Sequence, residues 1–60
     1  MDKFNEIKAL VASLEEDVEK FYEKGNKAAG TRLRTGLQQI KLLAQEVRID
    51  VQNLKNQEDE

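Results

Sequence analysis

Basic side chains gather in a short stretch of this 60-residue chain that also holds two of its three glycines. The stretch is Lys24-Gly25-Asn26-Lys27-Ala28-Ala29-Gly30-Thr31-Arg32-Leu33-Arg34. It lies between two segments of periodic apolar residues, so we expect the chain to turn here and a helix to begin. Cations next to a helix N-terminus form an arrangement that binds anions such as phosphate. The candidate phosphate ligands are Lys24, Lys27, Arg32 and Arg34, and the alternative is a simple solvated turn.

A second set of cations recurs at every seventh residue and consists of Lys27, Arg34, Lys41, Arg48 and Lys55. In a helix this spacing places them in one row, roughly 40 Å long at about 1.5 Å per residue. Such a row can follow DNA phosphates without reading the base sequence. Lys41 and Arg48 are therefore further candidates for phosphate contacts. The alternative is that the row forms ion pairs with a neighbouring helix.

No combination of residues typical of an enzyme is present. The sequence has no cysteine and no histidine, so the common nucleophiles, bases and metal ligands are missing. The acidic residues 15–17 are adjacent on a predicted helix and point in different directions, and Ser13 has no base. Gly25 and Gly30 do not form a phosphate-binding glycine loop, because no Lys-Ser or Lys-Thr pair follows at the required spacing. We expect no enzymatic activity, cofactor, metal or small-molecule substrate.

Length and composition predict a small helical domain. Charged residues make up 37% of the chain and proline is absent, which is typical of long helices. A chain of this length buries a small core, so self-association is the expected source of further stability. No apolar run has the length of a signal peptide or a membrane span. We expect a soluble cytoplasmic protein with no membrane partner.

Two stripes of apolar residues predict two helices. The first stripe is Phe4, Ile7, Val11, Leu14, Val18 and Phe21, and the second is Leu33, Leu37, Ile40, Ala44, Val47, Val51 and Leu54. Both have the alternating three- and four-residue spacing of a coiled coil. We expect helices over about 2–24 and 27–56, a turn at about 25–26, and an acidic tail at 57–60. Gly25 would end the first helix and Asn26 would cap the second, with Thr31 as an alternative start.

The short turn predicts an all-α fold, an antiparallel helical hairpin. Folding about Gly25 pairs residues whose numbers sum to about 51. Phe21 then lies opposite Gly30, and Leu14 lies opposite Leu37. On one flank, Lys3 falls beside Asp50.

Two features predict that hairpins dimerise into a four-helix bundle. The second helix outruns the first, so Val51 and Leu54 have no partner within the hairpin. Beside the pairing stripe, Ala29, Gly36 and Leu43 recur at seven-residue spacing. Small residues there would let another helix approach closely. The alternatives are that the overhang frays and that Gly36 is merely tolerated.

Charge is divided along the chain. Residues 1–23 carry three lysines against seven acidic residues, net −4, and residues 24–48 carry six basic residues against one, net +5. Residues 49–60 carry one lysine against four acidic residues, net −3. The acidic helix could pair internally with the basic one, or the basic segment could bind external phosphates.

The stretch 24–34 resembles the signature of the bacterial linker-histone-like family, the chlamydial-type histone-like DNA-binding proteins, in their short tail-less form. That signature reads Lys-Gly-Asn-x-Ala-Ala-Gly-x-Arg-x-Arg, and the resemblance covers nearly the whole chain. It implies a nucleoid-associated protein that condenses the chromosome by binding DNA with little sequence preference. The residues to which it assigns this contact are Lys24, Lys27, Arg32 and Arg34.

The chain departs from that family at Thr35, Leu42 and Ile49, where relatives usually carry lysine or another polar residue. It also ends in acidic residues, whereas chlamydial members carry a lysine-rich tail. Thr35, Leu42 and Ile49 are spaced by seven on the outer face of the second helix. This favours a second hypothesis, a structural self-assembly module with no nucleic-acid role, in which Leu42 and Ile49 drive oligomers beyond a dimer.

Overall fold

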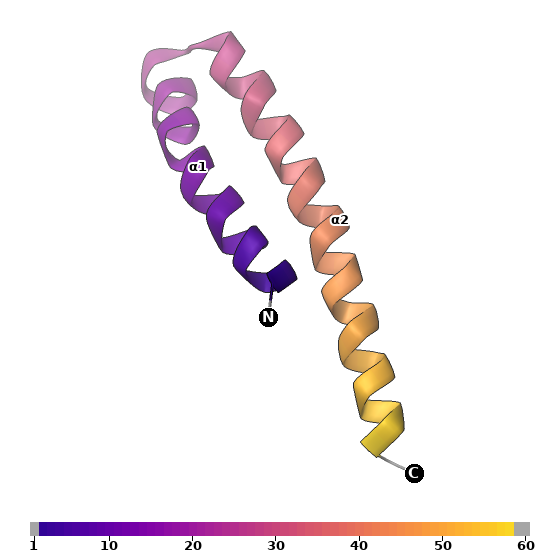
Figure 1. Cartoon of the computed structure of the whole chain (residues 1–60). Helices are drawn as coiled ribbons and strands as arrows, with labels where there is room; N and C mark the ends of the chain where they lie inside the picture. Colours follow the sequence, from indigo (N-terminus) through magenta and orange to yellow (C-terminus); the bar gives the residue numbers. More distant parts are fainter. Residues whose placement is uncertain (1, 59–60) are drawn as a thin grey trace.

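The computed structural model describes residues 2–58, which form two α-helices packed as an antiparallel hairpin (Figure 1). Helix α1 spans Asp2–Lys24 and helix α2 spans Lys27–Glu58. The predicted all-α hairpin is therefore confirmed. Helix α2 begins at Lys27 rather than at Thr31, and it ends two residues beyond the expected end near residue 56. Residues 59 and 60 of the expected tail lie outside the described residues.

Gly25 ends α1 because it adopts a backbone conformation that other residues rarely adopt. Its φ is +67°, in the left-handed region where glycine carries no steric penalty. The N–H of Gly25 donates to the carbonyl oxygen of Phe21 at 3.0 Å, and the N–H of Asn26 donates to that of Lys20 at 3.1 Å. These bonds satisfy carbonyl groups at the end of α1.

Asn26 starts α2 by capping its first turn. Its side-chain Oδ1 accepts a hydrogen bond from the N–H of Ala29 at 3.1 Å, as an N-cap residue does. Its backbone carbonyl accepts from the N–H of Gly30 at 3.2 Å. The cap explains why the helix begins here despite the low helix propensity of Gly30.

Small residues of α2 bring the two helices close together. Ala29 is fully buried, and Leu14 of α1 is 8% exposed. A Cβ atom on Gly36 would lie 2.6 Å from Cδ2 of Leu14, and one on Gly30 would lie 2.7 Å from Cδ1 of Phe21. The predicted opposition of Phe21 and Gly30 is thus confirmed.

The predicted opposition of Leu14 and Leu37 is wrong. Leu14 packs on Gly36, and Leu37 is 51% exposed. The idea that Ala29 and Gly36 receive a further helix is also wrong, because they pack against α1 of the same chain. The reason is steric: Gly36 has no side chain to hold Leu14 away, so the two backbones approach closely at this point.

The hairpin is elongated. Its Cα atoms extend over 53 × 15 × 13 Å with a radius of gyration of 15.3 Å, whereas a compact domain of this length has about 10 Å. Helix α2 continues well past the start of α1 (Figure 1). Near the start of α1, Nζ of Lys3 lies 3.3 Å from Oδ2 of Asp50, which confirms their predicted proximity. Neither helix has, within residues 2–58, an apolar stretch long enough to cross a membrane.

Candidate nucleic-acid interface

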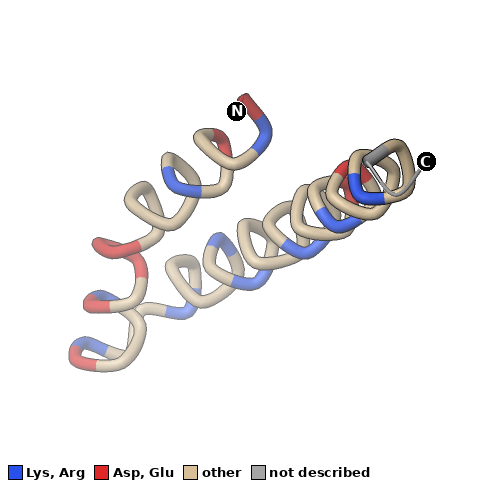
Figure 2. The backbone as a smooth tube through the Cα atoms, turned by 90° about the horizontal axis from the view of Figure 1, so that it is seen from below, with Lys and Arg blue, Asp and Glu red and all other residues tan. Residues whose placement is uncertain are grey.

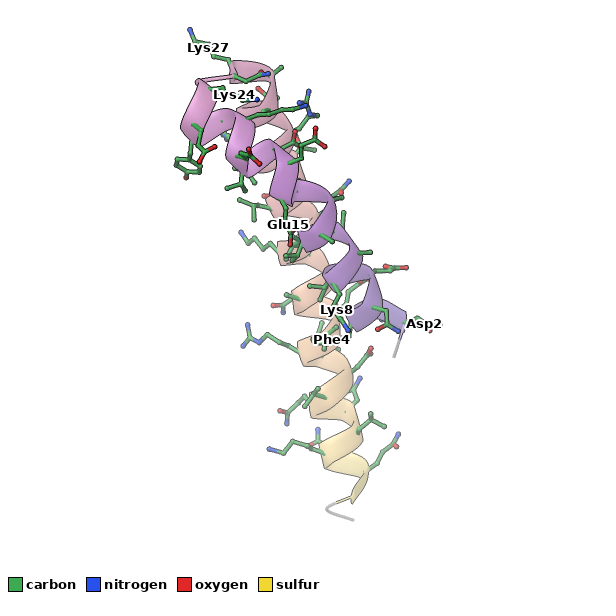
Figure 3. All side chains as sticks on the ribbon, turned by 90° about the vertical axis from the view of Figure 1, so that its left-hand side faces the viewer. Asp2, Phe4, Lys8, Glu15, Lys24 and Lys27 are labelled. Carbon is green, nitrogen blue, oxygen red and sulfur yellow. The ribbon has the colours of Figure 1, made fainter. Side chains whose placement is uncertain are left out.

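The turn brings the ends of both helices and their cations together. Lys24 is the last residue of α1 and Lys27 is the first of α2, and both are exposed. Figure 3 shows both at the turn end of the hairpin, with the side chain of Lys27 extending outward. The first N–H groups of a helix have no partner inside it. Since Asn26 caps Ala29, the N–H groups of Lys27 and Ala28 are the ones left to face an anion.

Arg32 is engaged within the hairpin. Its Nε donates to Oδ1 of Asp17 at 3.0 Å, and its Nη2 lies 2.9 Å from the same oxygen in an ion pair that links α2 to α1. The side chain of Asp17 is 14% exposed and that of Arg32 is 53% exposed. One edge of the guanidinium therefore holds the hairpin, while the rest remains in solvent.

The row of cations on α2 behaves differently. Arg34, Lys41 and Arg48 are exposed, and among residues 2–58 none of them forms an ion pair. Arg48 makes only a long hydrogen bond, from Nη1 to Oε1 of Gln45 at 3.5 Å. Glu15 of α1 does not pair with Arg34. These three charges are available to an external partner.

Acidic and basic positions occupy different helices. Figure 2 shows basic positions recurring along α2, while acidic positions cluster in the half of α1 nearest the turn. Glu15, Glu16, Glu19 and Glu23 are exposed, and Glu16 pairs with Lys20 of its own helix at 2.9 Å. A polyanion would therefore approach the hairpin from the side of α2 and be repelled from the outer side of α1.

An open groove runs along one flank of the hairpin. It has a volume of about 900 Å³ and is lined by Glu6, Ala9, Leu10, Ser13, Gln39, Leu42, Leu43, Gln45 and Glu46. Its walls are mostly apolar, and its two charged residues are both acidic. The groove is therefore unsuited to phosphate and suited to an apolar side chain or helix.

Sequence reasoning placed the six candidate cations on the correct helices but missed the role of Asp17. Lys24 and Lys27 flank the turn, Arg32 lies further along α2 beside Asp17 of α1, and Arg34, Lys41 and Arg48 are spread along α2. The signal for the Arg32–Asp17 pair was present, since their numbers sum to 49, near the value of 51 expected for facing residues. The acidic run 15–17 masked it, because three neighbouring carboxylates offered equivalent partners.

Comparison with known proteins gives one match. The family described as Histone H1-like protein Hc1 has a model that matches residues 1–57. The match covers both helices and the turn, so every candidate cation lies within it. No curated protein and no solved structure matches the chain significantly.

Proposed function

The chain belongs to the histone H1-like Hc1 family, and from this premise we propose that it is a nucleoid-associated protein that binds DNA without sequence specificity. Membership of a histone-like family implies a DNA-binding role, and it agrees with the prediction from the sequence that the chain is no enzyme. The observation that carries the proposal is the state of the six candidate cations. All six are exposed, and Arg32 is the one member of the six that forms an ion pair within residues 2–58.

The proposed contacts are to DNA phosphates from Lys24, Lys27, Arg32, Arg34, Lys41 and Arg48. From Lys27 to Arg48 the row spans roughly 32 Å at about 1.5 Å per residue. This is close to one helical turn of DNA, about 34 Å. Long flexible lysine and arginine side chains on a rigid helix can follow the phosphates over that length. Since phosphate contacts carry no base information, such binding does not depend on the DNA sequence. The proposed consequence is compaction of DNA of any sequence.

Self-association completes the proposal: hairpins form a homodimer, a four-helix bundle, that presents two basic surfaces to DNA. Its support is the amount of apolar surface that one hairpin leaves in solvent, including Val51 and Leu54 on the overhang of α2. Joining two weak binding surfaces raises the affinity without any new contact, because the second contact becomes intramolecular. Higher oligomers would extend the same effect.

The test is the binding of a labelled duplex of arbitrary sequence, followed by fluorescence anisotropy at two salt concentrations. Each neutralised phosphate releases counterions, so affinity falls with salt. Six contacts give about a thousandfold loss between about 50 mM and 200 mM salt. A second duplex of shuffled sequence should bind equally. Absence of binding at low salt, or an affinity that does not change with salt concentration, would contradict the proposal.

A second candidate function is structural self-assembly with no nucleic-acid role. The groove favours it, because Leu42 lines an apolar surface that phosphate cannot use. This hypothesis expects oligomers larger than a dimer, which the double substitution Leu42→Lys and Ile49→Lys returns to a dimer. Light scattering measures the mass directly. An unchanged mass in the double variant would exclude assembly through this flank.

A further inference from the structure

One lateral face of the hairpin is apolar and uncovered. It consists of Phe4, Val11, Val18, Leu37 and Val51, whose exposed fractions lie between 40% and 52%. We call this set the lateral face. The helical repeat explains why its members share one side. In α1, Val11 and Val18 each lie four positions after a residue that faces α2, namely Ile7 and Leu14. In α2, Leu37 lies four positions after Leu33 in the same way. A step of four positions rotates a side chain by the same angle about the axis of either helix. Because the two helices are antiparallel and face each other, this rotation carries the side chains of both to the same side of the hairpin.

The exposed area is what a second copy would cover. The chain has 5019 Å² of accessible surface, whereas a compact monomer of 6.9 kDa has about 4,000 Å². The excess of about 1,000 Å² is close to the roughly 800 Å² that each partner contributes to a stable interface. The hairpin as a whole therefore exposes in excess about the area that one partner of a stable dimer buries.

Charge decides how the two copies are oriented. A two-fold axis can place the lateral faces together with α1 on the partner's α1, or with α1 on the partner's α2. Helix α1 carries four lysines against seven acidic residues, net −3, and α2 carries six basic residues against three acidic ones, net +3. The first arrangement sets −3 against −3, and the second sets −3 against +3. Glu15 and Glu19 border the lateral face on α1, while Arg34 and Lys41 border it on α2. Lys8 also lies on the α1 border and reduces its negative charge without reversing it.

We infer that two copies associate through the lateral face with α1 of each hairpin against α2 of the other, so that both turns lie at the same end. The acidic border of one copy then lies along the basic border of its partner. Both turns present Lys24 and Lys27 at one end of the dimer, which forms a composite cationic surface. This last consequence rests on the proposed DNA binding, whereas the arrangement of the helices does not.

The arrangement can be tested without DNA, because the chain has no cysteine and one can be introduced at an exposed position. In the variant Asn56→Cys, a nitroxide label sits near the end of α2, and pulsed EPR measures the distance between the two labels of a dimer. With both turns at one end, the two α2 helices are parallel and we expect less than about 30 Å. In the opposite arrangement the labels lie at least about 40 Å apart, since each is more than 13 residues from the middle of α2. That result would overturn the arrangement and leave the DNA-binding proposal standing.

A matched pair of variants tests the face. Leu37 and Leu42 are the same residue type on the same helix and are 51% and 59% exposed, but they lie on opposite flanks. We expect Leu37→Lys to weaken dimerisation at least tenfold in sedimentation measurements, while Leu42→Lys leaves it within twofold. A parent chain that is monomeric, or a dimer lost in Leu42→Lys and kept in Leu37→Lys, would overturn the inference. Val11→Lys repeats the test on α1 and guards against a local effect on α2.

The composite cationic surface can be tested separately, by DNA affinity. Replacing Lys24 and Lys27 by glutamine should lower DNA affinity more than replacing Lys41 and Arg48 does, because both turns act together. The label distance should stay the same in the Lys24 and Lys27 variant, because neither residue belongs to the charged borders of the lateral face. If DNA affinity fell equally in the two, the turns would not form the main contact. If the parent bound no DNA while the label distance was short, the proposed function would fail and the dimer arrangement would stand.

Discussion

At the scale of single residues, two neighbouring arginines have different environments. Arg32 forms a hydrogen bond and an ion pair with Asp17, and Arg34 has no ion-pair partner among residues 2–58. The two side chains lie two positions apart on the same helix, so they turn in opposite directions from its axis. One therefore links the helices and the other faces solvent. Their substitution separates stability from binding.

Arg32→Gln should lower the free energy of unfolding by about 0.5–1 kcal/mol, since solvent screens this half-exposed ion pair. Arg34→Gln should change it by less than about 0.5 kcal/mol, because Arg34 holds no partner within the hairpin. Urea denaturation followed by circular dichroism measures both. Equal destabilisation by the two variants would contradict the inference that Arg32 links the helices and Arg34 does not.

Arg34→Gln should still reduce the slope of DNA affinity against salt by about one contact. Replacing both arginines by glutamate should abolish DNA binding.

Gly36 is the residue at which a single methyl group matters most. Alanine improves helix propensity by about 1 kcal/mol, but its Cβ would lie 2.6 Å and 2.7 Å from the two methyl carbons of buried Leu14. Overpacking of this kind costs about 1–3 kcal/mol. We expect Gly36→Ala to be destabilising by about 1 kcal/mol overall.

Gly30→Ala is the matched control for that variant. Its Cβ would lie 2.7 Å from the ring of Phe21, but this ring is partly exposed and can move away. Stability should therefore change by less than in Gly36→Ala. Urea denaturation compares the two. A Gly36→Ala chain more stable than the parent would show that Leu14 repacks freely, and the close approach of the helices would not depend on glycine.

At the scale of elements, the turn depends on Asn26. Its Oδ1 satisfies an N–H group of α2, and loss of such a cap costs about 1 kcal/mol. Asn26→Ala should lower the free energy of unfolding by that amount, and Asn26→Ser should retain most of it because serine also caps. Urea denaturation of the three proteins provides the measurement. Identical stabilities of the alanine and serine variants would mean that the cap does not limit the stability of α2.

The helices and the turn could be predicted from sequence because their signals are local. Seven-residue spacing, a left-handed glycine and a capping asparagine each act within a few residues. The rotation of α2 about its axis could not be predicted. Leu33, Ile40 and Val47 belong both to the stripe through Leu37 and to the stripe through Gly36, so the pattern does not choose between them. The choice depends on the distance between the helices, which a tertiary contact sets.

The candidate site was predictable only in part for a related reason. Lysine and arginine at the turn are visible in the sequence, but whether each is engaged depends on which carboxylate comes opposite. Asp17 reaches Arg32 across the hairpin, whereas Glu15 does not reach Arg34. Both pairs have the same register, since the residue numbers of each sum to 49, so the difference lies in the direction in which each side chain leaves its helix. Ion pairing between helices is therefore a property of packing, and spacing along one helix does not determine it.

At the scale of the whole molecule, stability should depend on protein concentration. One hairpin buries little, with Leu14 and Ala29 as its buried apolar residues within the described part of the chain. In the proposed dimer, the partner supplies further apolar burial. For a dimer that unfolds to two chains, a tenfold rise in concentration stabilises the native state by about 1.4 kcal/mol, by mass action. Thermal or urea unfolding at several concentrations should show this shift. In Leu37→Lys, dimerisation is weaker, so the unfolding midpoint should depend less on protein concentration. A parent chain whose midpoint does not depend on concentration would be a stable monomer.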